Sequence, residues 1–124
     1  MVASWHRWCT TADLQPAGPQ VRVTFTSGRS HRVRVDELDH GYLLTAVVAG
    51  ADAVDFLDDP AVQVWVRNRR SRLVGFRLDE RGRIVAHGWT PGAGLTAEAF
   101  QLYVRTVARE ADRYEFHLTG ADRF

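Results

Sequence analysis

The sequence predicts an α+β fold, with a mostly antiparallel sheet of about five to six strands, a long C-terminal helix packed on one face and a short N-terminal helix. Two patterns carry this prediction. Over much of the chain, apolar and polar residues alternate with a period of two, which is typical of strands with one buried face. Near the C-terminus, apolar residues are three and four positions apart, which is typical of a helix. A length of 124 residues suits one domain with its own core, so we expect a single domain over residues 1–124.

The N-terminal segment is expected to form a short helix, in which Trp5, Trp8 and Leu14 share one stripe. The Pro/Gly segment QPAGPQ that follows has the composition of a loop. Alternation then begins at residues 21–26 and resumes at residues 32–35, on either side of the turn sequence SGRS. These two stretches predict a hairpin with one buried face and one solvated face.

Residues 42–49, YLLTAVVA, are nearly all apolar, which predicts a central strand covered on both faces. The acidic sequence GADAVDFLDDP that follows indicates an irregular or short helical link. Valines at 62, 64 and 66 alternate with polar or aromatic residues and predict another strand. Residues 74–78 and 83–89 predict two more strands, joined by the tight turn DERGR, in which Gly82 suits a positive φ.

The C-terminal helix has the clearest signals at both ends. Thr96 is a good N-cap, and Glu98 places a negative charge in the first turn. Leu95 and Phe100 are spaced as a hydrophobic staple, and Gly120 is a natural stop. The predicted helix is roughly 23 residues long, or ~34 Å at the usual rise. Its apolar stripe comprises Phe100, Val104, Val107, Ala111, Tyr114 and Leu118.

The composition is that of an ordinary globular domain, with 45% hydrophobic and 25% charged residues. All 16 basic residues are arginine, and Asn and Ile occur once each, which indicates a G/C-rich coding bias typical of some bacteria. The single cysteine, Cys9, excludes an internal disulfide and fits a reducing compartment. The sequence contains no apolar run long enough for a signal peptide or a membrane span, so we expect a cytoplasmic location and no membrane partner.

Positive charge is concentrated in one part of the chain. Residues 61–89 carry seven arginines against two acidic residues, a local net charge of +5. This pattern leaves open nucleic-acid or anion binding through the arginine-rich segment 66–83. Nucleic acid is the less favoured reading, because Trp65 is the only nearby aromatic expected to be exposed and stacking binders usually offer several. A basic patch that meets an acidic protein surface, or the acidic segment DAVDFLDDP of this chain, is favoured instead.

Few residues suggest catalysis or metal binding. Cys9 is expected in a mobile N-terminus with no histidine partner indicated, and the five histidines form no metal-binding pair. Asp36, Asp39 and His40 could together hold a metal, but carboxylates in such a turn usually bind the turn backbone. We therefore expect no catalytic residue, no metal and no cofactor, and a protein that is not an enzyme.

The second half of the chain resembles the YbjN-like domains of bacteria, which are grouped with type III secretion chaperone-like folds. The shared pattern is a strand, a D-x-x-G turn, a second strand, a small-residue loop and an L-T-x-E-x-F helix start. The positions that match it are Phe76, Asp79, Gly82, Leu95, Thr96, Glu98 and Phe100. The resemblance implies a domain that binds peptides or proteins, often as a homodimer, without enzymatic activity.

Two surfaces are candidates for a protein or peptide partner. One lies in the arginine-rich segment, and the other is the outer face of the C-terminal helix, where a leucine ringed by arginines would form a small hot spot with a polar rim. The candidate residues are Trp65, Arg67, Arg69, Arg70, Leu102, Arg105 and Arg109.

Overall fold

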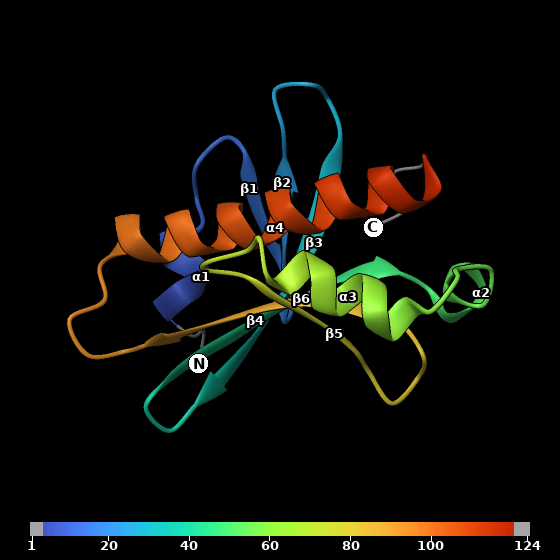
Figure 1. Ribbon diagram of the computed structural model, residues 1–124. Helices are drawn as coiled ribbons and strands as arrows, with labels where there is room; N and C mark the ends of the chain where they lie inside the picture. The colour runs from blue at the N-terminus through green and yellow to red at the C-terminus, as the bar shows by residue number, and fades with distance from the viewer. Residues whose placement is uncertain (1–3, 121–124) are drawn as a thin grey trace.

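The computed structural model describes residues 4–120 and confirms the predicted α+β fold (Figure 1). The helices and strands in chain order are α1 (Ser4–Trp8), β1 (Leu14–Ala17), β2 (Gln20–Thr24), β3 (Ser30–Leu38), β4 (Gly41–Ala49), α2 (Ala51–Val54), α3 (Pro60–Asn68), β5 (Gly75–Leu78), β6 (Ile84–Pro91) and α4 (Ala97–Thr119).

The six strands form one antiparallel sheet in the order β1-β2-β3-β4-β6-β5. Figure 1 shows α4 lying across one face of this sheet, with α3 beside it and α1 beneath its N-terminal half. Helix α3 packs on the edge strand β5. Because α3 and α4 lie on the same side, the opposite face of the sheet is an open, solvated surface in the part of the chain that is described.

Helix α4 follows the sequence prediction at both ends. The hydroxyl of Thr96 accepts a hydrogen bond from the Ala99 N–H at 3.1 Å, and Gly120 ends the helix at a φ of 68°. The apolar stripe faces the core, where Phe100 and Val104 are fully buried. Within residues 4–120, no helix is both long and apolar enough to cross a membrane.

The predicted hairpin of β2 and β3 is confirmed. Val21 pairs with Val33 under α4, whereas Arg22 pairs with Arg32 on the open face. Alternation in the sequence therefore separates the core from the solvated face in these two strands.

Strand β4 is central, as predicted, but it is covered on one face only. Its residues Leu44, Ala46 and Val48 are buried, while Leu43, Thr45 and Val47 between them are only half-buried. The expectation of a strand covered on both faces was wrong because both long helices lie on the same side of the sheet.

The N-terminal segment differs from its prediction. Helix α1 ends at Trp8, and Leu14 belongs to the edge strand β1 rather than to a helical stripe. Pro16 is tolerated in β1 because an edge strand has one side without ladder hydrogen bonds. The ring of Trp8 packs 5.2 Å from that of Phe100, centroid to centroid, so α1 is held against α4.

Candidate protein-binding surface

Residues 60–68 form helix α3, where the sequence predicted a strand. The alternating valines fit a strand, but Val62, Trp65 and Val66 also have the three- and four-residue spacing of one helix face. Pro60 occupies the first turn, where its fixed φ suits a helix and its missing N–H costs no hydrogen bond. The strand prediction was wrong because this short window satisfies both periods.

The inner face of α3 is fixed to the sheet by two side chains. Val64 is buried in the core. Asn68 accepts a hydrogen bond from the Phe76 N–H at 2.7 Å and donates its amide to the Phe76 carbonyl at 2.8 Å. The Asn68 amide therefore binds the outer edge of β5 as a neighbouring strand would.

Arg67, one of the residues proposed to bind a partner, also belongs to this inner face. It is half-buried, and its guanidinium lies 4.8 Å from the ring centroid of Tyr114 on α4 and 5.7 Å from that of Phe76. Stacking of this kind stabilises the contact between α3 and α4. Arg67 therefore joins two helices of the same chain.

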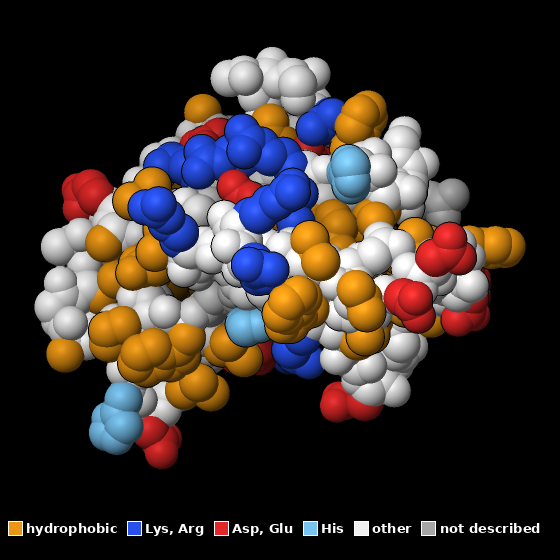
Figure 2. All heavy atoms as spheres, in the orientation of Figure 1, with side chains coloured by type: hydrophobic (Ala, Val, Ile, Leu, Met, Phe, Trp, Pro, Cys, Tyr) orange, Lys and Arg blue, Asp and Glu red, His pale blue; other side chains and the backbone are white. Residues whose placement is uncertain are grey.

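The outer face of α3 carries three apolar side chains, which we call the α3 patch: Val62, Trp65 and Val66. They are 56%, 60% and 41% exposed, respectively. Adjacent exposed apolar residues of this size mark interaction sites more often than single ones do. Figure 2 shows hydrophobic side chains over α3, with basic side chains at its C-terminal end and along α4.

Arg69 and Arg70 follow the α3 patch at the end of the helix, and both are exposed. The Arg69 guanidinium lies 5.2 Å from the ring centroid of Trp65. Arg69 therefore holds the tryptophan in place while its charge faces solvent. An apolar centre with a cation at its edge results, and Trp65 and Arg69 from the sequence prediction are thus brought together. Arg70 lies next in the chain and lines a hollow shared with Thr106 and Glu110 of α4.

The second predicted surface lies on the outer face of α4. Leu102 is 59% exposed and Arg109 is exposed beyond it. Arg105, however, is bound to Asp13 before β1, with its Nε 2.8 Å from Asp13 Oδ2. Arg105 anchors the N-terminal segment to α4 while its side chain stays 36% exposed, so its place in the rim around Leu102 remains a proposal.

This ion pair predicts a pH-dependent stability. The hydrogen bonds that Asp13 accepts from Arg105 lower the pKa of Asp13 from the usual 3.8 to about 2. The pair therefore contributes stability above about pH 4, and the contribution is lost as the pH falls towards 2. Asp13→Asn should destabilise the fold at neutral pH by only about 0.5–1 kcal/mol, since both side chains are more than one third exposed.

Urea unfolding of the wild type and Asp13→Asn at pH 6, 4 and 2 measures this effect. The difference in unfolding free energy should shrink between pH 4 and pH 2. A difference that stays constant over this range would show that Asp13 contributes through packing and not through its charge.

The arginine-rich segment does not form one stripe. Arg67, Arg69 and Arg70 belong to α3 or its end, Arg77 projects from β5, and Arg81 lies in the β5–β6 turn. A separate hollow of about 520 Å³ lies on the open face of the sheet, where the β5–β6 turn meets β3. Its charged lining residues are Arg32, Arg34, Arg81, Arg83 and the acidic Glu80.

The residues considered for chemistry do not assemble a reactive site. Cys9 is fully buried, which corrects its expected place in a mobile segment, and burial raises the pKa of its thiol to about 11. A thiol with this pKa is not a nucleophile at neutral pH. Asp36 accepts hydrogen bonds from Arg34, and Asp39 and His40 are exposed in the β3–β4 turn. Across residues 4–120, these three side chains do not converge as metal ligands.

The fold and this surface define a class: a small α+β domain with an open antiparallel sheet and an apolar, basic-rimmed helix on its covered side. Residues 20–119 match the YbjN family, described as "Putative bacterial sensory transduction regulator". The chain belongs to the YbjN family. A search of curated proteins by sequence finds no match.

Solved structures with the same fold include secretion chaperone complexes. A chain of the ExsC–ExsE complex superposes with a TM-score of 0.62 and 19% identity, over 94% of this chain and 89% of that one. YbjN from E. coli gives 0.59 and 18%, over 95% and 86%. A chain of the type III secretion complex ExoU–SpcU from Pseudomonas aeruginosa gives 0.57 and 15%, over 98% and 100%. At these identities the likeness shows a shared fold.

Proposed function

We propose that this chain is a non-enzymatic, chaperone-like protein-binding domain of the bacterial cytoplasm, and that its partner docks on the α3 patch. The observation that carries the proposal is that α3 is apolar on its solvent face as well as on its core face, with Trp65 60% exposed. Solved structures of this fold support it, because ExsC–ExsE, ExoU–SpcU and HopA1–SchA are all protein complexes.

The chemistry of the surface describes the partner. The α3 patch offers apolar contact area, and tryptophan is among the residues that dominate binding energy at interfaces. Arg69 and Arg70 at its end favour carboxylates. The proposed partner is therefore a protein or peptide segment with apolar side chains flanked by aspartate or glutamate. A second copy of the chain is a less suitable occupant at this end, because it would bring arginine towards arginine if the α3 helices packed in parallel.

Replacement of Trp65 by a photo-crosslinking amino acid should capture this partner in cells. We expect a discrete crosslinked product from position 65 and a much weaker one from position 26, an exposed position in the β2–β3 turn. The product should disappear when Val62→Asp is added, because a buried carboxylate in the interface is costly. It should persist when Leu102→Asp is added, because Leu102 lies on another helix.

Each result of this experiment bears on the proposal. Equal products at positions 65 and 26, or a product that is insensitive to Val62→Asp, would contradict docking on α3. A product that is lost with Leu102→Asp instead would move the site to the outer face of α4, with Leu102 and Arg109 as its centre. Crosslinking of the purified chain to itself would identify the homodimer.

Anion or nucleic-acid binding is the alternative function, and one observation favours it. The four arginines around the hollow on the open face come from two separate elements, β3 and the β5–β6 turn. A gel shift that weakens steeply with salt and with Arg32→Ala and Arg81→Ala would assign this face to nucleic acid.

A further inference from the structure

Three ionisable side chains meet in the core between β3 and α4. His31 lies on the inward face of β3, and Asp112 and Glu115 lie one turn apart on α4. They are 0%, 3% and 1% exposed, respectively. Each offers one ligand atom, and these three atoms lie within 4.8 Å of one another. Among the described residues, no other group of three histidine, cysteine or carboxylate side chains converges in this way.

The hydrogen bond of His31 determines which ring nitrogen faces the carboxylates. Its Nε2 lies 2.7 Å from the carbonyl oxygen of Val47, and a carbonyl can only accept, so Nε2 carries a hydrogen. In the neutral imidazole, Nδ1 then carries the lone pair. Nδ1 faces Asp112 Oδ1 at 3.9 Å and Glu115 Oε1 at 3.8 Å. With a neutral imidazole, one ring nitrogen and two carboxylate oxygens therefore face one another, which are donor atoms that metal ions bind.

The spacing of these atoms suits a bridging ion better than direct hydrogen bonds. Both distances are longer than the ~2.7–3.2 Å of an N–H···O hydrogen bond. Ligands bound at ~2.1 Å to a tetrahedral ion are roughly 3.4 Å apart. The three atoms, which lie within 4.8 Å of one another, would therefore have to approach one another by up to about 1.4 Å on binding. In addition, Asp112 Oδ1 is buried and accepts no hydrogen bond from the residues described. This buried oxygen is aimed into the cluster.

The surroundings hold these ligands in place. Arg29 donates to the other carboxylate oxygen of Asp112, Oδ2, which leaves Oδ1 directed at His31. The Val47 carbonyl fixes the imidazole, as backbone carbonyls commonly do for metal-bound histidines. The orientation of the donor atoms is therefore set by neighbours that would not themselves bind the ion.

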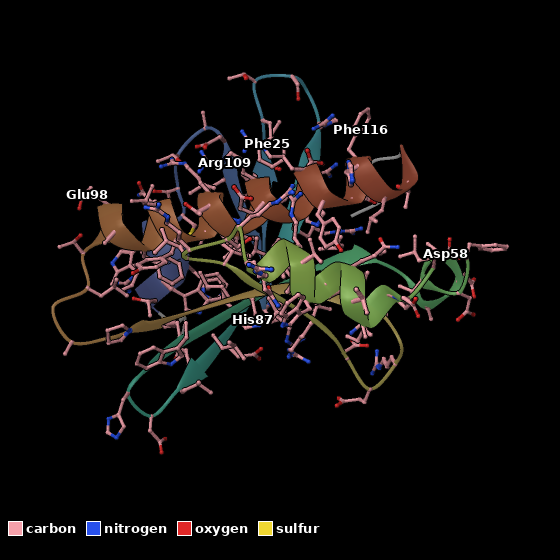
Figure 3. All side chains as sticks on the ribbon, viewed as in Figure 1. Phe25, Asp58, His87, Glu98, Arg109 and Phe116 are labelled. Atoms are coloured by element: carbon pink, nitrogen blue, oxygen red, sulfur yellow. The ribbon has the colours of Figure 1, made fainter. Side chains whose placement is uncertain are left out.

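Two hollows border the cluster, although its three donor atoms are themselves buried. Asp112 lines a hollow of about 550 Å³ between α4 and the β2–β3 hairpin, and Glu115 lines one of about 310 Å³ beside α2. Figure 3 shows the first of these regions, with Phe25 labelled on the hairpin side and Arg109 and Phe116 on α4.

We propose that His31 Nδ1, Asp112 Oδ1 and Glu115 Oε1 bind one divalent first-row transition-metal ion, with zinc as the best match. One imidazole and two carboxylates suit zinc, and three protein ligands leave a position for water. The ion would tie β3 to α4 from within the core. This site departs from the sequence prediction of no metal, and it does not depend on the proposed function.

Titration of chelator-treated protein with zinc chloride tests the proposal, with a chromophoric chelator as competitor. We expect one ion per chain. Glu115→Gln and Asp112→Asn keep the side-chain shape but should weaken binding by more than roughly 100-fold, the upper end of the loss from substitutions beyond the ligands themselves. His117→Gln is the matched control, because His117 is exposed on the same helix and should bind zinc as the wild type does. Zinc should raise the melting temperature of the wild type and of His117→Gln, but not of Glu115→Gln.

Zinc X-ray absorption of the wild type provides a readout that needs no variant to fold. The expected first shell has one imidazole, oxygen ligands and no sulfur. A shell with sulfur or with two or more imidazoles would overturn the proposal. Binding weaker than about 1 mM, or equal binding by a folded Glu115→Gln, would also overturn it and would leave a protonated His31 as the positive charge of the cluster.

Discussion

Phe100→Ala should lower the free energy of unfolding by about 3–5 kcal/mol, the usual loss for a large aromatic side chain in a core. Phe100 is fully buried at the start of α4. Its ring centroid lies 5.2 Å from that of Trp8, 5.3 Å from that of Tyr42 and 6.3 Å from that of Trp5. The substitution therefore removes the side chain on which α1, β4 and α4 meet, and a cavity would remain between three rigid rings.

Chemical denaturation of both proteins measures this loss, which would be a large share of the ~5–15 kcal/mol that stabilises a typical domain. Leu102→Ala is the control, because Leu102 lies two residues away on the same helix but is 59% exposed. It should change the unfolding free energy by less than about 0.5 kcal/mol. Equal losses for the two variants would mean that the phase of α4 is wrong.

Gly41→Ala should have the second-largest effect, with a loss of about 1–3 kcal/mol or more from overpacking. Gly41 begins β4 and pairs with Pro91 of β6. A Cβ atom at this position would lie 2.2 Å from the carbonyl oxygen of Thr90 and 3.0 Å from the Cα of Pro91. Both contacts are with backbone, so the two central strands would have to separate locally.

Gly92→Ala is a matched control in the same corner of the sheet. There the nearest atom to an added Cβ is the His40 carbonyl oxygen at 3.7 Å, an ordinary van der Waals contact. Thermal melting should therefore separate the two variants clearly. If both melt at the same temperature as the wild type, β4 and β6 do not approach each other as closely at Gly41 as described here.

Sequence patterns predicted the elements that are marked by a long periodic pattern or by capping residues at both ends. Helix α4 is 23 residues long, with an apolar stripe along it and Thr96 and Gly120 at its ends, and both caps are present. Helix α3 was missed because its nine residues satisfy the periods of a strand and of a helix equally well. Strand β1 was missed because Pro16 within four residues resembles a loop, and only its place at the sheet edge makes it acceptable.

For the candidate surfaces, local sequence patterns predicted which side chains are exposed but not which distant residues they contact. The exposure of Trp65 and Leu102 could be anticipated from local patterns, and both are exposed. The engagement of Arg105 could not, since its partner Asp13 is 92 residues away in the chain. His31 occupies the same strand phase as the buried valines, which is the one sequence signal that could have indicated a buried histidine. Its approach to Asp112 and Glu115 depends on how α4 lies across the sheet.

The two edges of the sheet bear on how this protein behaves at high concentration. An open sheet can grow by adding strands from other molecules, which is a common route to aggregation. On one side, the Asn68 amide already occupies the backbone of Phe76 in β5. On the other, β1 is four residues long and Pro16 offers no N–H to an incoming strand. Both edges are thus poor templates, and an apolar surface such as the α3 patch can remain exposed with less risk of ordered polymerisation.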